Sequence, residues 1–318
     1  MLFSLLNTPA AAVRPVRGAP GPGAPAAARV PKRRPHVLRE GAARALFGTA
    51  AALSIAAVAL ICLFLLANGV PAMAEIGLPE FLFGTTWRPV NDLYGIFPMI
   101  VGSLYVTAGA MIVGVPGGLL TALYFSRFAR GRTGSFLRSG VELLAGIPSV
   151  VYGFFGLVII VPFVRLLGPG TGLSVLAASL ILGIMILPTV ITVAQSALDA
   201  VPARYYEGAL ALGVDHEHAV FKVVAPAAAS GIMAAIVLGL GRAIGETMAV
   251  VMVAGNMPII PDSLLSGVRT MTANIVLEMG YAADLHREAL IATGVVLFVF
   301  ILLITMLLNV IRKRGEAR

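Results

Sequence analysis

The chain has 318 residues, of which 58% are hydrophobic and only 12% are charged. This balance indicates a polytopic membrane protein and excludes a soluble globular domain. The net charge of +8 does not indicate a nucleic-acid-binding protein, because most of the basic residues lie in a few clusters that flank apolar runs.

Two kinds of ligand site are also excluded by the sequence. None of the three lysines follows a glycine, so the chain has no GxxxxGK[ST] phosphate loop and we expect no nucleotide or other cofactor to bind to it. Cys62 stands alone inside an apolar run, which leaves no disulfide framework or thiolate metal site. His216 and His218 are two residues apart and would not share a helix face, so we expect no metal site there either.

The N-terminal part of the chain is predicted to be an arm followed by one membrane helix. Residues 1–40 are rich in Pro, Ala and Arg, with seven prolines between Thr8 and Pro35, and are predicted to be a disordered arm. A first transmembrane helix is expected at residues 45–66. Trp87 and Tyr94 follow it and are expected to anchor the chain at the membrane interface.

Five more spans are expected to form a core at residues 98–311, because each apolar run can cross a bilayer that needs about 20 residues. Pro116 is expected to bend or locally unpair one of them and Pro188 to interrupt another, whereas Pro148 is expected to start a helix that breaks from a short lead-in. A short helix is expected at Ala273–Met279. The predicted spans are Pro98–Phe125, Val141–Val164, Leu173–Leu198, Ala228–Gly255 and Ala289–Ile311.

The distribution of positive charge predicts the orientation of these spans. Six spans place both termini on one side, and that side would hold eighteen Lys and Arg residues against four on the other. Cytoplasmic loops carry the excess of Lys and Arg, so both termini are expected in the cytoplasm. The basic tail at residues 312–318 and the polar loop at residues 199–227 would lie on the same side.

The polar loop at residues 199–227 is predicted to contain two short helices. Good helix formers precede Gly213, which is expected to end the first helix, and Asp215 is expected to cap a second one that runs through Phe221. Pro226 is expected to end that helix and open the fifth span. Such a compact helical knob suits a groove on a partner protein. An ordinary amphipathic loop lying on the membrane is the alternative.

The fifth predicted span contains Arg242 near its middle and Glu246 four residues later, where opposite charges share a helix face and can meet. Charges at the bilayer centre cost at least about 2.5 kcal/mol each, so they usually face a polar pathway. Arginine is permanently charged, and its planar fork matches phosphate oxygens. Arg242, Glu246 and Thr247 are therefore the candidate residues of an anion pathway. A buried ion pair that only joins two helices is the alternative.

The polar loop resembles the cytoplasmic EAA motif of ABC importer permeases. The matching residues are Glu207, Ala209, Gly213, Val223 and Pro226, whereas Gly208 and Ala225 depart from the motif. The resemblance implies that this loop is a coupling helix pair that docks into a groove of an ATPase subunit. ATP-Mg would then bind to that partner and not to this chain.

Three further stretches resemble the PstC-type permease subunits of bacterial phosphate ABC transporters. They are GIPSVVYGFFGL at residues 146–157, GLGRAIGETMAVVMVAGN at 239–256 and RTMTANIVLEMGYA at 269–282. The resemblance implies an all-α, six-helix type I importer permease (MetI-like) fold in the bacterial cytoplasmic (inner) membrane. It also implies a subunit that is not itself an enzyme and that translocates inorganic phosphate by alternating access. The implied partners are a homologous sister permease, two ATPase subunits and an extracytoplasmic phosphate-binding protein.

Two alternatives to phosphate import follow from the same residues. A permease of this architecture could carry another oxyanion, such as sulfate or molybdate. From a different class, an ion-coupled secondary transporter would show inverted repeats and ion ligands at the midplane. The sequence shows no clear repeat, and a coupling loop would have no purpose in such a protein.

Overall fold

The computed structural model describes residues 37–129 and 131–316. Contacts divide the chain into two units, residues 1–56 and 57–318, and the described part of the first unit is the beginning of helix α1 (Val37–Ile76). The predicted span at residues 45–66 lies inside this helix. Most of the predicted N-terminal arm lies outside the described residues.

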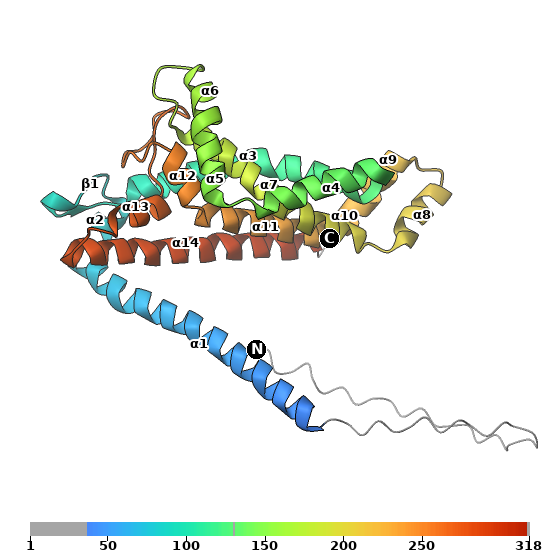
Figure 1. Cartoon of the computed structure of the whole chain (residues 1–318), viewed down its shortest axis with the longest axis horizontal. Helices are drawn as coiled ribbons and strands as arrows, with labels where there is room; N and C mark the ends of the chain where they lie inside the picture. The colour runs from blue at the N-terminus through green and yellow to red at the C-terminus, as the bar shows by residue number, and fades with distance from the viewer. Residues whose placement is uncertain (1–36, 130, 317–318) are drawn as a thin grey trace, which may run out of the picture. The chain divides into compact units, whose positions relative to one another are not determined.

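Four helices of the described chain are long and apolar enough to cross a membrane, and the number is up to six if each of two bent helix pairs forms one span. The four helical runs are Ala43–Ile76, Phe97–Phe128, Val175–Asp199 and Asp284–Val310. The core of the second unit consists of α3 (Phe97–Leu123), α7 (Val175–Asp199), α11 (Ala229–Gly245) and α14 (Asp284–Glu316), which lie side by side (Figure 1).

One end of this core, called here the hairpin end, comprises residues 78–96 and 256–286. Helix α2 (Leu78–Phe83) leads into a two-stranded antiparallel hairpin of β1 (Trp87–Arg88) and β2 (Leu93–Tyr94), joined by the 3-10 turn η1 (Pro89–Asn91). Helix α13 (Met271–Glu278) lies at the same end (Figure 1) and confirms the short helix predicted there.

The opposite end, called here the loop end, comprises residues 124–129 and 199–228. Helix α3 finishes there in the π-helical turn η2 (Tyr124–Phe128). Helix α7 leads into α8 (Ala203–Ala211), which is followed by a continuous helical run of α9 (His216–Ala219), η4 (Val220–Val224) and α10 (Ala225–Ala227).

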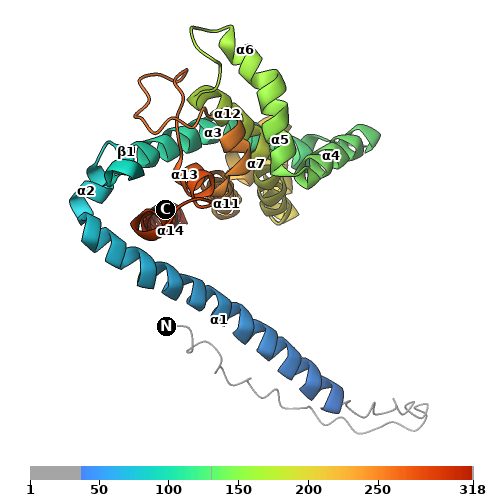
Figure 2. The ribbon, with the colours of Figure 1, turned by 60° about the vertical axis from the view of Figure 1, so that its left-hand side comes forward.

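The third predicted span is broken at Pro148, as expected, but the segment before the break is a helix of 16 residues and not a short lead-in. Helix α4 (Gly131–Gly146) meets the run of α5 (Ser149–Phe155), η3 (Gly156–Ile160) and α6 (Val161–Arg165) at an angle of 100°, which both views show (Figures 1 and 2). The bend falls at Pro148, since the residue before a proline is disfavoured in the helical region. Pro148 itself is extended and caps α5, so the predicted helix start is confirmed within one residue.

The predicted interruption at Pro188 is wrong, because this proline lies inside the continuous helix α7. Pro116 likewise lies inside the continuous helix α3, where its missing N–H leaves one carbonyl unpaired, as predicted, without ending the helix. The two helices pack closely through small residues. A Cβ on Gly114 would lie 2.5 Å from the Ile186 side chain, and one on Gly118 would lie 2.7 Å from Val190. Such close packing between neighbouring helices is what allows proline within membrane helices.

The fifth predicted span, by contrast, is broken. Helix α11 ends at Gly245, Glu246 adopts an extended backbone (φ −69°, ψ 134°), and α12 (Met248–Val253) begins two residues later. Three glycines in the last two turns of α11 lower its helix propensity. The Glu246 carboxylate accepts a hydrogen bond from the Ala249 N–H at 3.2 Å and so supports the new start.

Candidate substrate pathway and coupling loop

Helix α8 and the turn after it match the predicted first half of the coupling loop. Gly213 has a φ of +84°, a left-handed conformation that glycine adopts without steric cost. The N–H of Gly213 bonds to the Leu210 carbonyl at 2.9 Å, and the next N–H bonds to the Ala209 carbonyl at 3.2 Å. These bonds close the C-terminus of the helix. The predicted stop is therefore confirmed.

The second half of the loop begins at the predicted cap. Asp215 Oδ1 accepts a hydrogen bond from the His218 N–H at 2.7 Å and lies 2.8 Å from His218 Nδ1. These hydrogen bonds from the backbone and side chain of His218 lower the pKa of the Asp215 carboxyl. The predicted end at Pro226 is wrong, because the helical run includes Pro226 and bends by 72° around Ala228.

The five residues that match the EAA motif are spread over both halves of the loop, and they differ in exposure. Glu207, Gly213 and Pro226 are exposed, Val223 is half-buried and Ala209 is buried. The loop packs against a cluster of apolar side chains at the loop end of the core. Its buried members are Ala122, Ala194, Leu198, Val201, Val224, Ala228 and Ala235.

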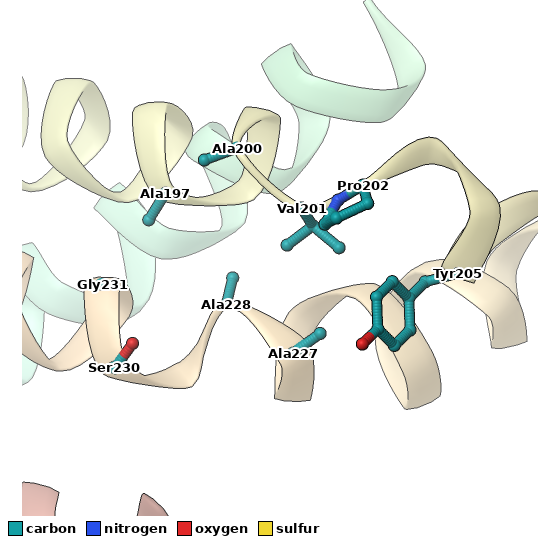
Figure 3. A pocket seen from close by; sticks show the side chains of 9 residues that line it. All are labelled: Ala197, Ala200, Val201, Pro202, Tyr205, Ala227, Ala228, Ser230 and Gly231. Carbon is teal, nitrogen blue, oxygen red and sulfur yellow. The ribbon is translucent and has the colours of Figure 1, made fainter. Parts of the chain in front are cut away.

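A hollow of about 390 Å³ separates the start of the loop from the start of α11 (Figure 3). Small side chains line most of it, and Tyr205 lies across one side (Figure 3). Deeper between the helices the contact is tight, because a Cβ on Gly231 would lie 2.3 Å from the Ala197 Cβ. The hollow therefore lies where the end of α7 and the first residues of the loop face the start of α11.

The candidate pathway residues lie at the break between α11 and α12. Arg242 is exposed in the last turn of α11, and its Nη1 donates a hydrogen bond to Thr189 Oγ1 of α7 at 3.2 Å. Glu246 is half-buried, and its carboxylate accepts the hydrogen bond from the Ala249 N–H in the first turn of α12. Thr247 bonds back to the Gly245 carbonyl at 3.3 Å.

The predicted contact between Arg242 and Glu246 is wrong. Among the described residues the two form no ion pair, because the helix ends between them and turns the Glu246 side chain toward α12. The sequence analysis assumed one continuous helix, in which residues four apart share a face. Sequence reasoning also missed Thr189. A hydroxyl directly after a proline within an apolar span could have drawn attention to it.

A second polar cluster, centred on Glu278, lies at the hairpin end. The buried Glu278 carboxylate is 2.6 Å from Arg269 Nη1, 2.8 Å from Trp87 Nε1 and 2.9 Å from His286 Nε2. It therefore joins β1, the segment before α13, α13 itself and α14. The predicted interface role of Trp87 and Tyr94 is wrong, because both rings are buried and pack edge to face.

The Glu278 cluster is connected to the break between α11 and α12. Arg269 Nε also donates to the Asn256 carbonyl at 2.9 Å, just beyond α12. Thr272 Oγ1 in α13 donates to the Glu246 carbonyl at 3.1 Å. Partial burial, and then the negative charge of Glu278, raise the pKa of the Tyr281 hydroxyl, which lies at the surface of the same cluster. A change in the position of α13 would therefore reach the backbone of the candidate pathway.

Comparisons with known proteins agree with this architecture. The profile of the family described as "Binding-protein-dependent transport system inner membrane component" matches residues 114–316. The chain is 35% identical to the "Probable ABC transporter permease protein YqgH" of Bacillus subtilis over 294 residues, which are 90% of this chain and 95% of that protein. It is 33% identical to the phosphate transport system permease protein PstC of Mesorhizobium japonicum over 279 residues, 81% of this chain and 85% of that protein.

Solved structures share the fold. An inward-facing structure of the MetNI methionine ABC transporter superimposes with a TM-score of 0.53 at 21% identity, over 72% of this chain and 99% of that one. Another crystal form of it gives a TM-score of 0.52 over 70% of this chain. The chain is an all-α polytopic membrane protein with the type I (MetI-like) importer permease fold.

Proposed function

Because the chain belongs to the family of binding-protein-dependent transport system inner membrane components, we propose that this ABC importer permease subunit translocates inorganic phosphate. Its relatives in Mesorhizobium japonicum and Mycobacterium tuberculosis are named phosphate transport system permeases, and they support phosphate as the substrate. ATP hydrolysis by a separate ATPase subunit drives alternating access. This chain binds no cofactor and supplies the pathway and the coupling loop.

The exposed guanidinium of Arg242 is the observation that carries the anion assignment. It lies next to a broken membrane span and has Thr189 as its only hydrogen-bond partner among the described residues. No described carboxylate neutralises it, so an oxyanion would meet an available positive charge. Phosphate oxygens fit the arginine fork in a bidentate way. The Thr189 hydroxyl accepts from Arg242 and keeps its own O–H to donate to the anion.

The partners and the orientation belong to the same proposal. A homologous sister permease completes the pathway as a heterodimer, and an extracytoplasmic phosphate-binding protein delivers the anion. Glu207, Ala209, Gly213, Val223 and Pro226 face or shape the contact with two ATPase subunits. Both termini and the coupling loop lie in the cytoplasm of a bacterium, as the excess of Lys and Arg on that side indicates.

The test is uptake of radiolabelled phosphate into proteoliposomes that contain the full complex and ATP. Arg242→Gln removes the charge but keeps hydrogen-bonding capacity. A hydrogen bond to a charged group contributes about 1.5–3 kcal/mol, so we expect uptake to fall about 10- to 160-fold while assembly is unchanged. Arg242→Lys keeps the charge but not the planar fork, and should recover only part of the loss.

The double variant Arg242→Gln with Glu246→Gln separates a pathway role from a structural ion pair. If a pair forms in another state of the cycle, removing both charges should restore uptake, because no lone charge remains buried. A pathway arginine is not rescued, because the anion still lacks its positive partner. Uptake near the parent level in the double variant would therefore contradict the assignment.

Two competing functions are measured in the same vesicles. Saturable uptake of sulfate or molybdate, with no uptake of phosphate, would identify a permease for another oxyanion. Uptake that needs an ion gradient and no ATP would identify a secondary transporter. Phosphate uptake that depends on ATP and on the binding protein supports the proposal.

A further inference from the structure

Both halves of the coupling loop meet at one hydrogen bond. The Tyr206 hydroxyl in α8 lies 2.6 Å from His216 Nδ1 in α9, and the two rings are perpendicular with centroids 5.6 Å apart. Tyr206 and His216 are both half-buried. The hydrogen bond closes the loop on itself, so α8 and α9 move together while it is intact.

The same two rings rest on the end of α3. Phe128 in η2 packs edge to face against His216, with centroids 4.6 Å apart. The Arg127 guanidinium lies over the Tyr206 ring, 5.8 Å from its centroid, within reach of a cation–π interaction. Consecutive residues of η2 thus contact both halves of the loop.

Arg127 also connects this contact to α7. Its Nη2 donates to the Leu198 carbonyl at 3.0 Å, in the last turn of α7, where carbonyls lack helical partners and attract positive charge. Beside it, Ser126 Oγ lies 2.5 Å from Asp199 Oδ1. Arg127 therefore touches the loop with the face of its guanidinium and α7 with an edge, which a lysine could not do.

Helices α3 and α7 are packed too closely to absorb a movement between them. A Cβ on Gly109 would lie 2.3 Å from Ser179 Oγ, and one on Gly114 would lie 2.7 Å from the Gly183 carbonyl. Thr189, the partner of Arg242, lies on α7 itself. Between the end of α7 and the start of α11, by contrast, the hollow at the base of the loop leaves space (Figure 3).

We propose that Arg127, Phe128, Tyr206 and His216 form a clamp through which ATP-driven movement of the coupling loop is transmitted to α3 and α7, and through Thr189 to Arg242. The proposal rests on the coupling role assigned above to residues 199–227. These four are positioning residues, since none of them touches the substrate. Side-chain contacts of this kind carry coupling only when they join elements that move as units. At one end of the clamp the Tyr206–His216 bond joins α8 to α9, and at the other end α3 and α7 pack tightly against each other, so each end moves as a unit.

The experiment compares two neighbouring tyrosines in the full complex. Tyr206→Phe removes only the hydroxyl that bonds to His216, whereas Tyr205→Phe removes an exposed hydroxyl that has no protein partner among the described residues. The measured quantity is phosphate transported per ATP hydrolysed. We expect the ratio to fall about fivefold or more in Tyr206→Phe, the factor expected from one lost hydrogen bond, and to stay at the parent value in Tyr205→Phe.

Two further variants distinguish a clamp from ordinary packing. Arg127→Lys keeps the charge and should lower the ratio, while basal ATP hydrolysis and assembly stay unchanged. Tyr206→Phe combined with His216→Phe should be no worse than either single change, because both remove the same bond. A merely structural role would instead reduce assembly and ATP hydrolysis together and leave the ratio unchanged, which would overturn the proposal.

A second readout does not depend on the substrate. Amide hydrogen exchange at residues 119–128 should change when ATP is added to the parent complex, and this response should be lost in Tyr206→Phe. If the parent transports no phosphate but still shows this response, the substrate assignment fails and the clamp stands. If Tyr206→Phe and Arg127→Lys both keep the parent response, the clamp is overturned.

Discussion

Two glycines of the coupling loop allow the same substitution to be compared in opposite backbone settings. Gly213 has a φ of +84°, whereas Gly208 lies inside helix α8, and no heavy atom lies within 4 Å of a Cβ built on either. Alanine therefore fits at both positions without a clash. Any difference between Gly213→Ala and Gly208→Ala must come from the backbone.

The two alanine substitutions are expected to change the stability of the folded loop in opposite directions. A non-glycine residue in the left-handed region costs roughly 1–2 kcal/mol, so Gly213→Ala should open the turn about 5- to 30-fold more often. Alanine inside a helix is better than glycine by roughly 0.5–1 kcal/mol, so Gly208→Ala should close α8 more firmly by about 2- to 5-fold. Gly213→Val adds a β-branched side chain and should cost more than alanine.

Hydrogen exchange of the amides at residues 212–214 measures the opening of this turn directly, since these N–H groups bond to carbonyls of α8. We expect faster exchange in Gly213→Ala and slower exchange in Gly208→Ala. Gly213→Val should also lower transport per ATP hydrolysed while the spans remain folded. Equal exchange rates in the two alanine variants, or normal coupling in Gly213→Val, would refute the role assigned to this turn.

Three further predictions concern other parts of the molecule. Glu278→Gln should weaken the bond to Arg269 and lower thermal stability by several degrees, because a half-buried arginine loses its charged partner; an unchanged melting temperature would contradict this. Gly231→Leu should separate α7 from α11 at Ala197 and cost about 1–3 kcal/mol, which chemical denaturation in detergent can measure. The pKa of Asp215 is lowered in the folded loop, so its cap is complete above the ordinary pKa and is lost as the pH falls through the lowered one. Exchange of the His218 amide should rise over that acidic range in the parent and much less in Asp215→Asn, which caps without titrating.

The sequence by itself determined the class of the protein and the local structure of the coupling loop. Apolar runs and flanking charges indicated a polytopic membrane protein, because hydrocarbon tolerates few other patterns. Gly213 and Asp215 predicted a stop and a cap correctly, because both are local effects that depend on one residue and its immediate neighbours. The motifs that carry the family resemblance can likewise be read from short stretches of neighbouring residues.

Only the tertiary structure decided which helices break and which side chains meet. Pro116 and Pro188 remain in continuous helices because α3 and α7 pack against each other, whereas the apolar run around Glu246 breaks at a glycine-rich helix end. Hydropathy cannot distinguish a continuous helix from a broken one here, since the outcome depends on whether a neighbouring helix packs against the proline or glycine and satisfies the freed backbone groups. Arg242 consequently pairs with Thr189 of α7 and not with Glu246. The hydrogen bonds from Trp87 to Glu278 and from Arg127 to Leu198 likewise join residues that are 191 and 71 positions apart, and sequence periodicity does not predict such long-range contacts.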